Sequence, residues 1–336
     1  MFISSRRLGP LPLVAAAVLS FAACNGDDSP LAPQDAAPAS APAAAADLGQ
    51  VDAVAPAEAA LITTQRIAFV STRLGGYWSA YKMDPAGNNV VHLTKTGNDV
   101  FQPAWSYDNK RLAVARGRAD GNGAYNDDIW LVNADGTNGH WLRNTMSPWS
   151  LKDPSWAPDG SHLLVALYWV NAWYLAKIEV ASGNITLLHP SGGGIPGGAP
   201  SYDKAGKRIV YVSANRRSLV QVNADGSGAK TLYQNVTNPL DQPRFSPDGG
   251  RLAFQKGAAG SNTDIFVKNL GTGVVTRLTT SPAWDGVATW SPDGTKLAFA
   301  SARLGVMQIY TMTATGANQT RITHTSTAEA WPAWTH

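Results

Sequence analysis

Residues 245–254 read FSPDGGRLAF, and 45 residues later the chain repeats them as WSPDGTKLAF at 290–299. An earlier copy, WAPDGSHLLV, begins at Trp156. In each copy an aromatic residue ends one apolar run, and a second apolar run follows the turn-forming residues. Proline presets the backbone at the second position of a β-turn, and glycine accepts the conformation that comes after it. The stretch therefore predicts two strands joined by a tight turn.

The unit recurs six times along the chain. Two other features keep the same period: a turn of the Asn-Ala-Asp-Gly type and a closing strand of the Arg-Leu-Thr type. Four short strands in about 45 residues, repeated, are typical of the blades of a β-propeller. Intervals of 51, 46, 43, 45 and 44 residues separate the positions two before the aromatic, which are Pro103, Pro154, Pro200, Pro243, Ala288 and Pro332.

The ends of the repeat region predict how the ring closes. The region begins with RIAFVS at Arg66, which is a second strand, and ends with AWPAWTH, which is a first strand. Together the two fragments complete one blade and remove the open sheet edges that favour aggregation. We expect an all-β, six-bladed propeller of four-stranded blades over residues 62–336, closed by pairing of the N- and C-terminal strands.

The blade pattern P-x-W-S-P-D-G-x-[KR]-[LI]-A-F, followed by D-I-[WF], N-A-D-G and R-L-T, resembles the propeller repeat of the TolB family. That family supplies the periplasmic component of the Tol–Pal envelope system, and the resemblance covers nearly all of residues 62–336. TolB-type proteins carry a small α/β domain before the propeller, where this sequence has a segment of another kind. Related repeats occur in prolyl oligopeptidase-type enzymes and oligogalacturonate lyases, so the resemblance alone leaves catalysis open.

Residues 1–23 have the features of a lipoprotein-type signal peptide. Basic SSRR precedes the apolar LGPLPLVAAAVLSFAA, which prolines interrupt and which is too short to span a bilayer. The only cysteine, Cys24, follows SFAA, and this stretch resembles the lipobox in which a lipidated cysteine becomes the mature N-terminus. We predict that Cys24 is lipidated, with Asn25 favouring the outer membrane. The alternative is an ordinary cleaved signal peptide and a soluble, periplasmic or secreted protein.

Composition separates a tether from a globular part. Residues 24–61 are rich in alanine and proline and nearly free of aromatics, which predicts a disordered tether. Overall, 44% apolar and 15% charged residues are sufficient for a large core. Lys and Arg number 27 against 24 Asp and Glu, and without Arg6 and Arg7 of the signal peptide the balance is 25 against 24. This balance gives no support to a nucleic-acid-binding surface.

Motifs of known catalytic and metal sites do not occur in the sequence. G-x-S-x-G, H-E-x-x-H and C-x-x-C are all missing, and the six histidines are scattered singly. The segment DGNGAYNDD at 120–128 lacks the spacing of an EF-hand loop. Local hydrogen bonding to the backbone explains the repeated turn aspartates Asp159, Asp248 and Asp293. We therefore predict no catalytic residue, no metal and no cofactor.

Function is expected where the repeat is irregular. In a propeller, the loops joining strand two to strand three and those joining one blade to the next gather at one mouth of the channel, here called the channel-mouth face. Tryptophan and arginine are enriched in binding hot spots, although these tryptophans could instead cap the blade interfaces. The candidate binding residues are Trp78, Trp149, Trp169, Trp173, Arg216, Arg217, Trp284, Arg303 and Trp331, with Arg73 and Arg118 beside them. The candidate channel-mouth carboxylates are Asp99, Asp153, Asp241, Asp285 and Glu329.

Two hypotheses of different classes follow. The first is a non-enzymatic, lipid-anchored, monomeric envelope protein on the periplasmic side of the outer membrane, which binds a protein or a peptidoglycan-associated partner through the channel-mouth face. The rival is a carbohydrate-binding or carbohydrate-active propeller, in which tryptophans stack on sugar rings and paired carboxylates supply acid and base. A lyase would gather histidines and a metal around the channel, and the sequence shows no patterned set of either.

Overall fold

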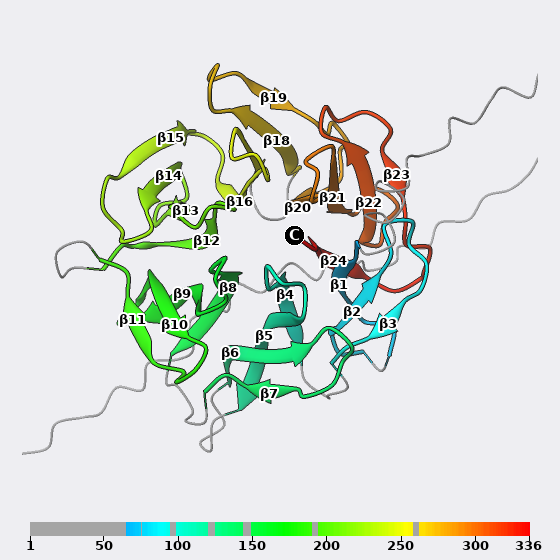
Figure 1. The fold of residues 1–336 in the computed structure, drawn as a ribbon. Helices are drawn as coiled ribbons and strands as arrows, with labels where there is room; N and C mark the ends of the chain where they lie inside the picture. The colour runs from blue at the N-terminus through cyan, green and yellow to red at the C-terminus, as the bar shows by residue number, and fades with distance from the viewer. Residues whose placement is uncertain are drawn as a thin grey trace, which may run out of the picture. The chain divides into compact units, whose positions relative to one another are not determined.

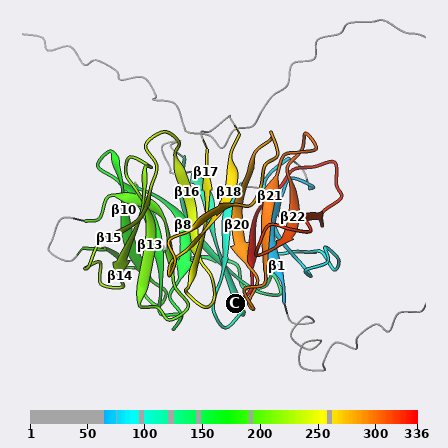
Figure 2. The ribbon, with the colours of Figure 1, turned by 90° about the horizontal axis from the view of Figure 1, so that it is seen from above.

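The computed structural model describes residues 65–336, except 75, 95–98, 120–124, 144–148, 190–193 and 258–261. Within these residues the chain forms six four-stranded antiparallel sheets, which stand as blades around a central axis (Figure 1). Turned by 90°, the same blades stand side by side (Figure 2). The expected all-β, six-bladed propeller is confirmed. The predicted signal peptide, Cys24 and the tether lie outside the described residues, in which no helix is long and apolar enough to cross a membrane.

Five blades follow the order of the chain, with the first strand of each innermost. Blade 2 contains β4 (Val100–Trp105), β5 (Arg111–Ala119), β6 (Tyr125–Asn133) and β7 (His140–Trp141). Blade 3 contains β8 (Ser150–Trp156), β9 (His162–Trp169), β10 (Ala172–Glu179) and β11 (Ile185–Leu187). Blade 4 contains β12 (Gly197–Tyr202), β13 (Arg208–Ser213), β14 (Ser218–Asn223) and β15 (Lys230–Gln234). Blade 5 contains β16 (Leu240–Phe245), β17 (Arg251–Lys256), β18 (Asp264–Asn269) and β19 (Val275–Arg277), and blade 6 contains β20 (Asp285–Trp290), β21 (Lys296–Ser301), β22 (Gln308–Thr313) and β23 (Thr320–Arg321).

Blade 1 joins the two ends of the repeat region, as the sequence predicted. Its innermost strand is β24 (Glu329–Trp334), which pairs with β1 (Ile67–Ser71), followed by β2 (Ser79–Met83) and β3 (Val91–His92). The Ile67↔Trp334 pair and the Ser71↔Glu329 pair set the register. The Trp334 side chain is buried, and its indole Nε1 donates a hydrogen bond to Gln65 Oε1 at 3.2 Å. The innermost strand of this blade thus comes from the opposite end of the propeller sequence.

In three blades the repeated tryptophan fastens the blade to its neighbour. The indole Nε1 of Trp156 donates to the Ala104 carbonyl at 3.0 Å, and that of Trp290 donates to the Arg244 carbonyl at 3.1 Å. Trp105 makes the equivalent bond to the Ala333 carbonyl of blade 1 at 3.1 Å. Because these donors are otherwise buried with no access to water, each bond is costly to lose.

The turns after the aromatic have the predicted chemistry. In blade 5, Gly249 N donates to the Ser246 carbonyl at 2.8 Å, and Gly249 has a φ of 67°. Asp248 Oδ1 accepts hydrogen bonds from the Ser246 hydroxyl and, at 3.0 Å, from the Gly250 N–H, and these two bonds lower the pKa of the Asp248 carboxyl. Asp293 accepts the Thr295 N–H at the same distance in blade 6. The turn aspartates therefore stabilise their own turns.

Deletion of residues 331–336 tests closure of the ring. We expect the free energy of unfolding to fall by at least about 3 kcal/mol, because the deletion removes most of β24 together with the buried Trp334 side chain. Urea unfolding followed by circular dichroism measures the change. The control is Trp169→Ala, which removes an exposed tryptophan and should leave the midpoint nearly unchanged. A truncated protein with the midpoint of the full chain would contradict closure by β24.

Candidate functional site

A β-bulge recurs at one position in every innermost strand. The residue at that position has a φ between 47° and 53°, and the pairing with the second strand shifts there. Positive φ is uncommon for residues other than glycine and costs of order 1–3 kcal/mol when the surroundings enforce it. The six residues, here called the bulge ring, are Gln102, Asp153, Ala199, Gln242, Val287 and Trp331.

Polar side chains of the bulge ring bond across the channel. Gln102 Nε2 donates to Asp153 Oδ1 at 2.6 Å, and Asp153 N donates to Gln102 Oε1 at 3.0 Å. Gln242 Nε2 donates to the same Asp153 oxygen at 2.8 Å. These bonds connect blades 2, 3 and 5, passing the small Ala199 of blade 4. Next to them lies a cavity of about 100 Å³, lined in part by Gln102, Gln242, Val287 and Trp331.

Two of the candidate tryptophans meet beside the bulge ring. Trp331 contacts Trp78 edge-on, with ring centroids 5.7 Å apart, and contacts Phe101 at 5.3 Å in the same manner. Trp78 lies in the β1–β2 connection, and its backbone N–H donates a hydrogen bond to Asp99 Oδ1 at 2.9 Å. Both indoles are half-buried. This aromatic group therefore serves partly as structure and partly as the wall of the channel mouth.

Trp169 and Trp173 belong to a long hairpin in blade 3. β9 and β10 are each eight residues long, and they turn at Val170 and Asn171 with φ values of 46° and 64°. Two positive φ values match the twist that a tight hairpin requires. Trp169 is 38% exposed, and Trp173 packs against Tyr168 with ring centroids 5.2 Å apart. The hairpin thus presents aromatic side chains on a rigid support.

The remaining candidate tryptophans pack mainly against cores. Trp149 packs on the core between blades 2 and 3, and Trp284 packs on the core between blades 6 and 1. Both are half-buried, as expected for tryptophans that cap the interfaces between blades.

Two predicted channel-mouth carboxylates are fully buried. Glu329 Oε1 lies 2.8 Å from Arg73 Nη2 and also accepts the hydroxyls of Ser71 and Thr325. Asp285 Oδ2 lies 3.0 Å from Arg303 Nη2. Burial raises the pKa of both carboxyls, and the neighbouring guanidinium groups oppose that rise. Asp285, Glu329, Arg73 and Arg303 therefore form matching structural ion pairs in adjacent blades, closed off from solvent on the carboxylate side.

The other charged candidates lie closer to solvent. Asp241 pairs with Arg216, with 2.5 Å between Oδ2 and Nη2, and the Arg216 side chain is 47% exposed. Arg217 N donates to Asn215 Oδ1 at 3.0 Å in the same β13–β14 turn. The side chain of Arg118 lies outside the described residues.

Sequence analysis missed four members of the bulge ring, which are Gln102, Ala199, Gln242 and Val287. The signal was available, because each stands directly before the repeat position occupied by proline in five of the six blades. It also missed the exposed apolar side chains of the connections between the second and third strands. These are Leu74 (59% exposed), Tyr77 (53%), Leu304 (60%) and Val306 (38%).

The bulge ring itself engages the Asp153 carboxylate. Asp153 is held by two side-chain amides, which are poor proton acceptors, and it has no second carboxylate as a hydrogen-bonding partner. Among residues 65–336 outside the gaps, no three His, Cys, Asp or Glu side chains stand close enough to hold a metal ion.

Comparison with known proteins agrees with this geometry. A family model described as the TolB beta propeller domain matches residues 196–336. The Tol-Pal system protein TolB of Alcanivorax borkumensis is 30% identical over 117 residues, which are 33% of this chain and 25% of that protein. An uncharacterized protein of Agrobacterium fabrum is 28% identical over 195 residues, which are 55% of this chain and 62% of that protein. The crystal structure of TolB from Acinetobacter baumannii superimposes with a TM-score of 0.67 at 18% identity, covering 81% of this chain and 67% of that one.

By its fold and by the family match over residues 196–336, the chain is TolB-like. This TolB-like chain spans less than two thirds of the length of the curated relatives named above. An oligogalacturonate lyase in complex with manganese shares the fold with a TM-score of 0.51 at 16% identity, covering 76% of this chain and 73% of that one. At such low identity the lyase and the solved TolB structures are informative about the fold alone.

Arg303→Met tests the buried ion pair of the TolB-like propeller. The change leaves the Asp285 carboxylate buried without its cation, and we expect the free energy of unfolding at pH 7 to fall by about 3 kcal/mol. Since the folded-state pKa of Asp285 is raised, the folded protein binds the proton more tightly than the unfolded chain. The deficit should therefore shrink as the pH falls from 7 to 5. Urea midpoints at several pH values measure it.

Two controls accompany that measurement. Arg216→Met removes the more exposed partner of Asp241 and should change stability by less than about 1 kcal/mol. The double variant Asp285→Asn/Arg303→Met should recover part of the lost stability, because no carboxylate remains buried at position 285. A pH-independent deficit that the double variant does not reduce would contradict the electrostatic explanation.

Proposed function

We propose that this protein is a non-catalytic, lipid-anchored component of the bacterial cell envelope, which binds a protein or peptidoglycan-associated partner through its channel-mouth face. The observation that carries the proposal is the concentration of exposed apolar side chains in the connections between the second and third strands. Leu74 and Tyr77 lie between β1 and β2, Val170 lies between β9 and β10, and Leu304 lies between β21 and β22. Aromatic and apolar anchors of this kind are typical of protein-binding surfaces.

The bulge ring supports the same proposal. Every blade has the same strained backbone at this position, yet the side chain differs from blade to blade. A repeated backbone with varied side chains provides a rigid frame on which specificity can be built. Side chains held in this way lose little entropy on binding a partner.

The relatives support an envelope setting. The Alcanivorax borkumensis relative is by name a Tol-Pal system protein. We infer that the present chain works in the same compartment as a monomer, on the periplasmic side of the outer membrane, with Cys24 as its lipid attachment site.

Site-specific photocrosslinking in intact cells tests the binding face. A photoreactive phenylalanine analogue replaces Leu304 on the channel-mouth face or Val274 in the β18–β19 turn at the other face, and both positions are 60% exposed. We expect a discrete crosslinked product from position 304 only. Trp169→Ala and Trp331→Ala in the position-304 background should reduce that product at least about tenfold, because a buried aromatic anchor contributes about 2 kcal/mol or more. Equal crosslinking at positions 304 and 274, or from 274 alone, would contradict the proposed face.

Cys24→Ser tests the anchor. Wild-type protein should require detergent for release from membranes, whereas the variant should appear in the aqueous fraction, since it lacks the acceptor for the lipid. Immunoblotting of the two fractions measures the distribution, and the unchanged thermal unfolding of the propeller serves as the control. Release of both proteins into aqueous buffer to the same extent would overturn lipidation.

The blade 3 hairpin favours a second candidate function, which is carbohydrate binding. Tyr168 and Trp169 are 40% and 38% exposed on a rigid support, and flat aromatic faces stack on sugar rings. Quenching of tryptophan fluorescence by soluble peptidoglycan fragments, abolished by Trp169→Ala, would favour this function over protein binding.

A further inference from the structure

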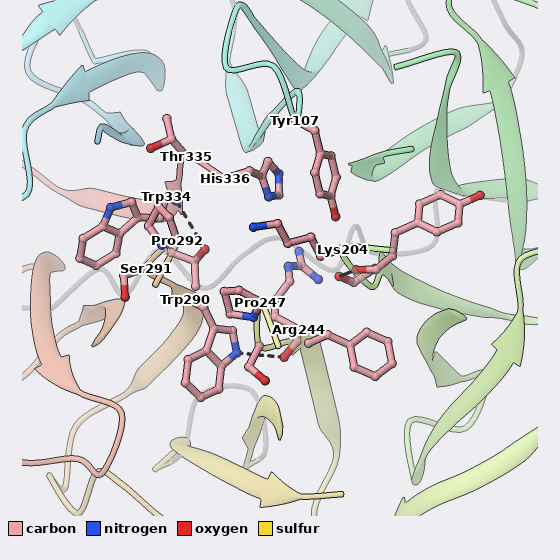
Figure 3. Close-up of a pocket in the computed structure, with 15 residues that line it drawn as sticks. Tyr107, Lys204, Arg244, Pro247, Trp290, Ser291, Pro292, Trp334, Thr335 and His336 are labelled. Atoms are coloured by element: carbon pink, nitrogen blue, oxygen red, sulfur yellow. Dashed lines mark hydrogen bonds between the residues drawn. The ribbon is translucent and has the colours of Figure 1, made fainter. Parts of the chain in front are cut away.

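The channel has a second opening at the face of the Ser-Pro-Asp-Gly turns. A cavity of about 90 Å³ lies there, roughly the volume of three water molecules. Its lining includes two cations, Lys204 and Arg244, and no Asp or Glu among the described residues. Figure 3 shows the Lys204 amine, the Arg244 guanidinium, the Tyr107 ring and the His336 imidazole around this space.

All four side chains depart from the repeat. Five blades have a small residue directly after the Pro or Ala of the innermost strand, and these are Ala104, Ser155, Ser201, Thr289 and Ala333. Blade 5 has Arg244 there. The second turn position is proline in three blades, Pro158, Pro247 and Pro292, and in the other three it is Tyr107, Lys204 and His336. The irregular side chains therefore gather at one cavity, although they come from four different blades.

The Arg244 guanidinium bonds only to neutral acceptors among the described residues. Nη1 donates to the Pro243 carbonyl at 2.9 Å, and Nη2 donates to Gln242 Oε1 at 3.0 Å. Arginine has five N–H donors and stays charged even when partly buried. Asp153 and Asp241 act on Arg244 through space. A positive charge therefore faces the cavity without a carboxylate bonded to it.

Neutral groups complete the site. His336 stacks on Tyr107 with ring centroids 3.8 Å apart, and its Nε2 bonds to the Trp105 carbonyl at 3.2 Å. The His336 residue as a whole is exposed, but burial of its ring lowers the pKa of the imidazole to about 4. Burial also raises the pKa of the Tyr107 hydroxyl, which therefore remains a donor. Pro247, Trp290 and Pro292 form an apolar wall of the same cavity.

Three carboxylates near this opening bond to groups other than the two cations of the cavity. Asp248 and Asp293 accept hydrogen bonds inside their own turns and do not line the cavity. Asp203, next to Lys204 in sequence, pairs with Arg208 at 2.8 Å.

We propose that this cavity is a binding site for a small organic carboxylate, with the carboxylate group between Lys204 and Arg244 and the carbon chain against Pro247, Trp290 and Pro292. The site lies at the end of the channel opposite to the proposed partner-binding face and is independent of it. Lys204 and Arg244 both attract a carboxylate, and hydrogen bonds between charged groups are stronger than those between neutral groups. The apolar wall distinguishes an organic acid from an inorganic anion of similar size.

The test replaces each of the two cations with a residue that other blades have at the same position of the repeat. Lys204→Pro introduces the turn residue of blades 3, 5 and 6, and Arg244→Ser introduces the residue of blades 3 and 4, so both variants are expected to fold. Lys230→Gln, which removes an exposed lysine on β15, is the matched control. Butanoate, which has one carboxylate and a short carbon chain, is the probe, and inorganic phosphate is the comparison. Isothermal titration at constant ionic strength measures binding, and thermal unfolding reports whether each variant is folded.

We expect butanoate to bind wild type and Lys230→Gln alike. Each of the two site variants should weaken binding about tenfold, since a hydrogen bond to a charged group contributes about 1.5–3 kcal/mol. If Arg244→Ser fails to fold, Lys204→Pro alone decides. Equal binding by wild type and the folded site variants would overturn the proposal. Binding of phosphate but not of butanoate would overturn the assignment to an organic acid.

Discussion

The pairing of β1 with β24 is the interaction on which the rest of the structure depends. It joins Ile67 to Trp334 and so connects the two ends of the propeller sequence. Without β24, blade 1 has no innermost strand, and the Trp105 indole loses its acceptor at Ala333. Trp331 of the bulge ring and His336 of the opposite opening belong to β24 or follow it directly. Both proposed sites therefore require a closed ring, because closure places these residues at the channel.

Residues that follow the repeat and residues that differ between blades have different roles in this ring. The turn aspartates bond to their own backbone, and the repeated tryptophans fasten neighbouring blades, so repetition here reflects structure. In the bulge ring, the backbone is the regular part and the side chain is the irregular part. Its backbone is the same in six blades, with the positive φ that most residues avoid, while its side chains range from Ala199 to Trp331. Strain maintained by a closed ring allows those side chains to vary without loss of the fold.

The two ends of the channel differ in charge. Asp153 and two glutamines lie at the bulge ring, and Asp241 lies beside it, whereas Lys204 and Arg244 line the opposite opening. Arg244 stands between them, because it lines both cavities and donates to Gln242.

The sequence by itself determined the architecture of this protein. Its period gave six blades, its turn chemistry gave the strand boundaries, and its incomplete end fragments gave closure, because each of these depends on local residue order. The tertiary structure decided which irregular residues act together. The sequence placed Asp285 and Glu329 among the channel-mouth carboxylates. In the structure Arg303 and Arg73 pair with them, and their burial depends on contacts between strands that are far apart in the chain. Likewise Lys204, Arg244, Tyr107 and His336 come from four blades, and only the curvature of the closed ring brings them to one cavity.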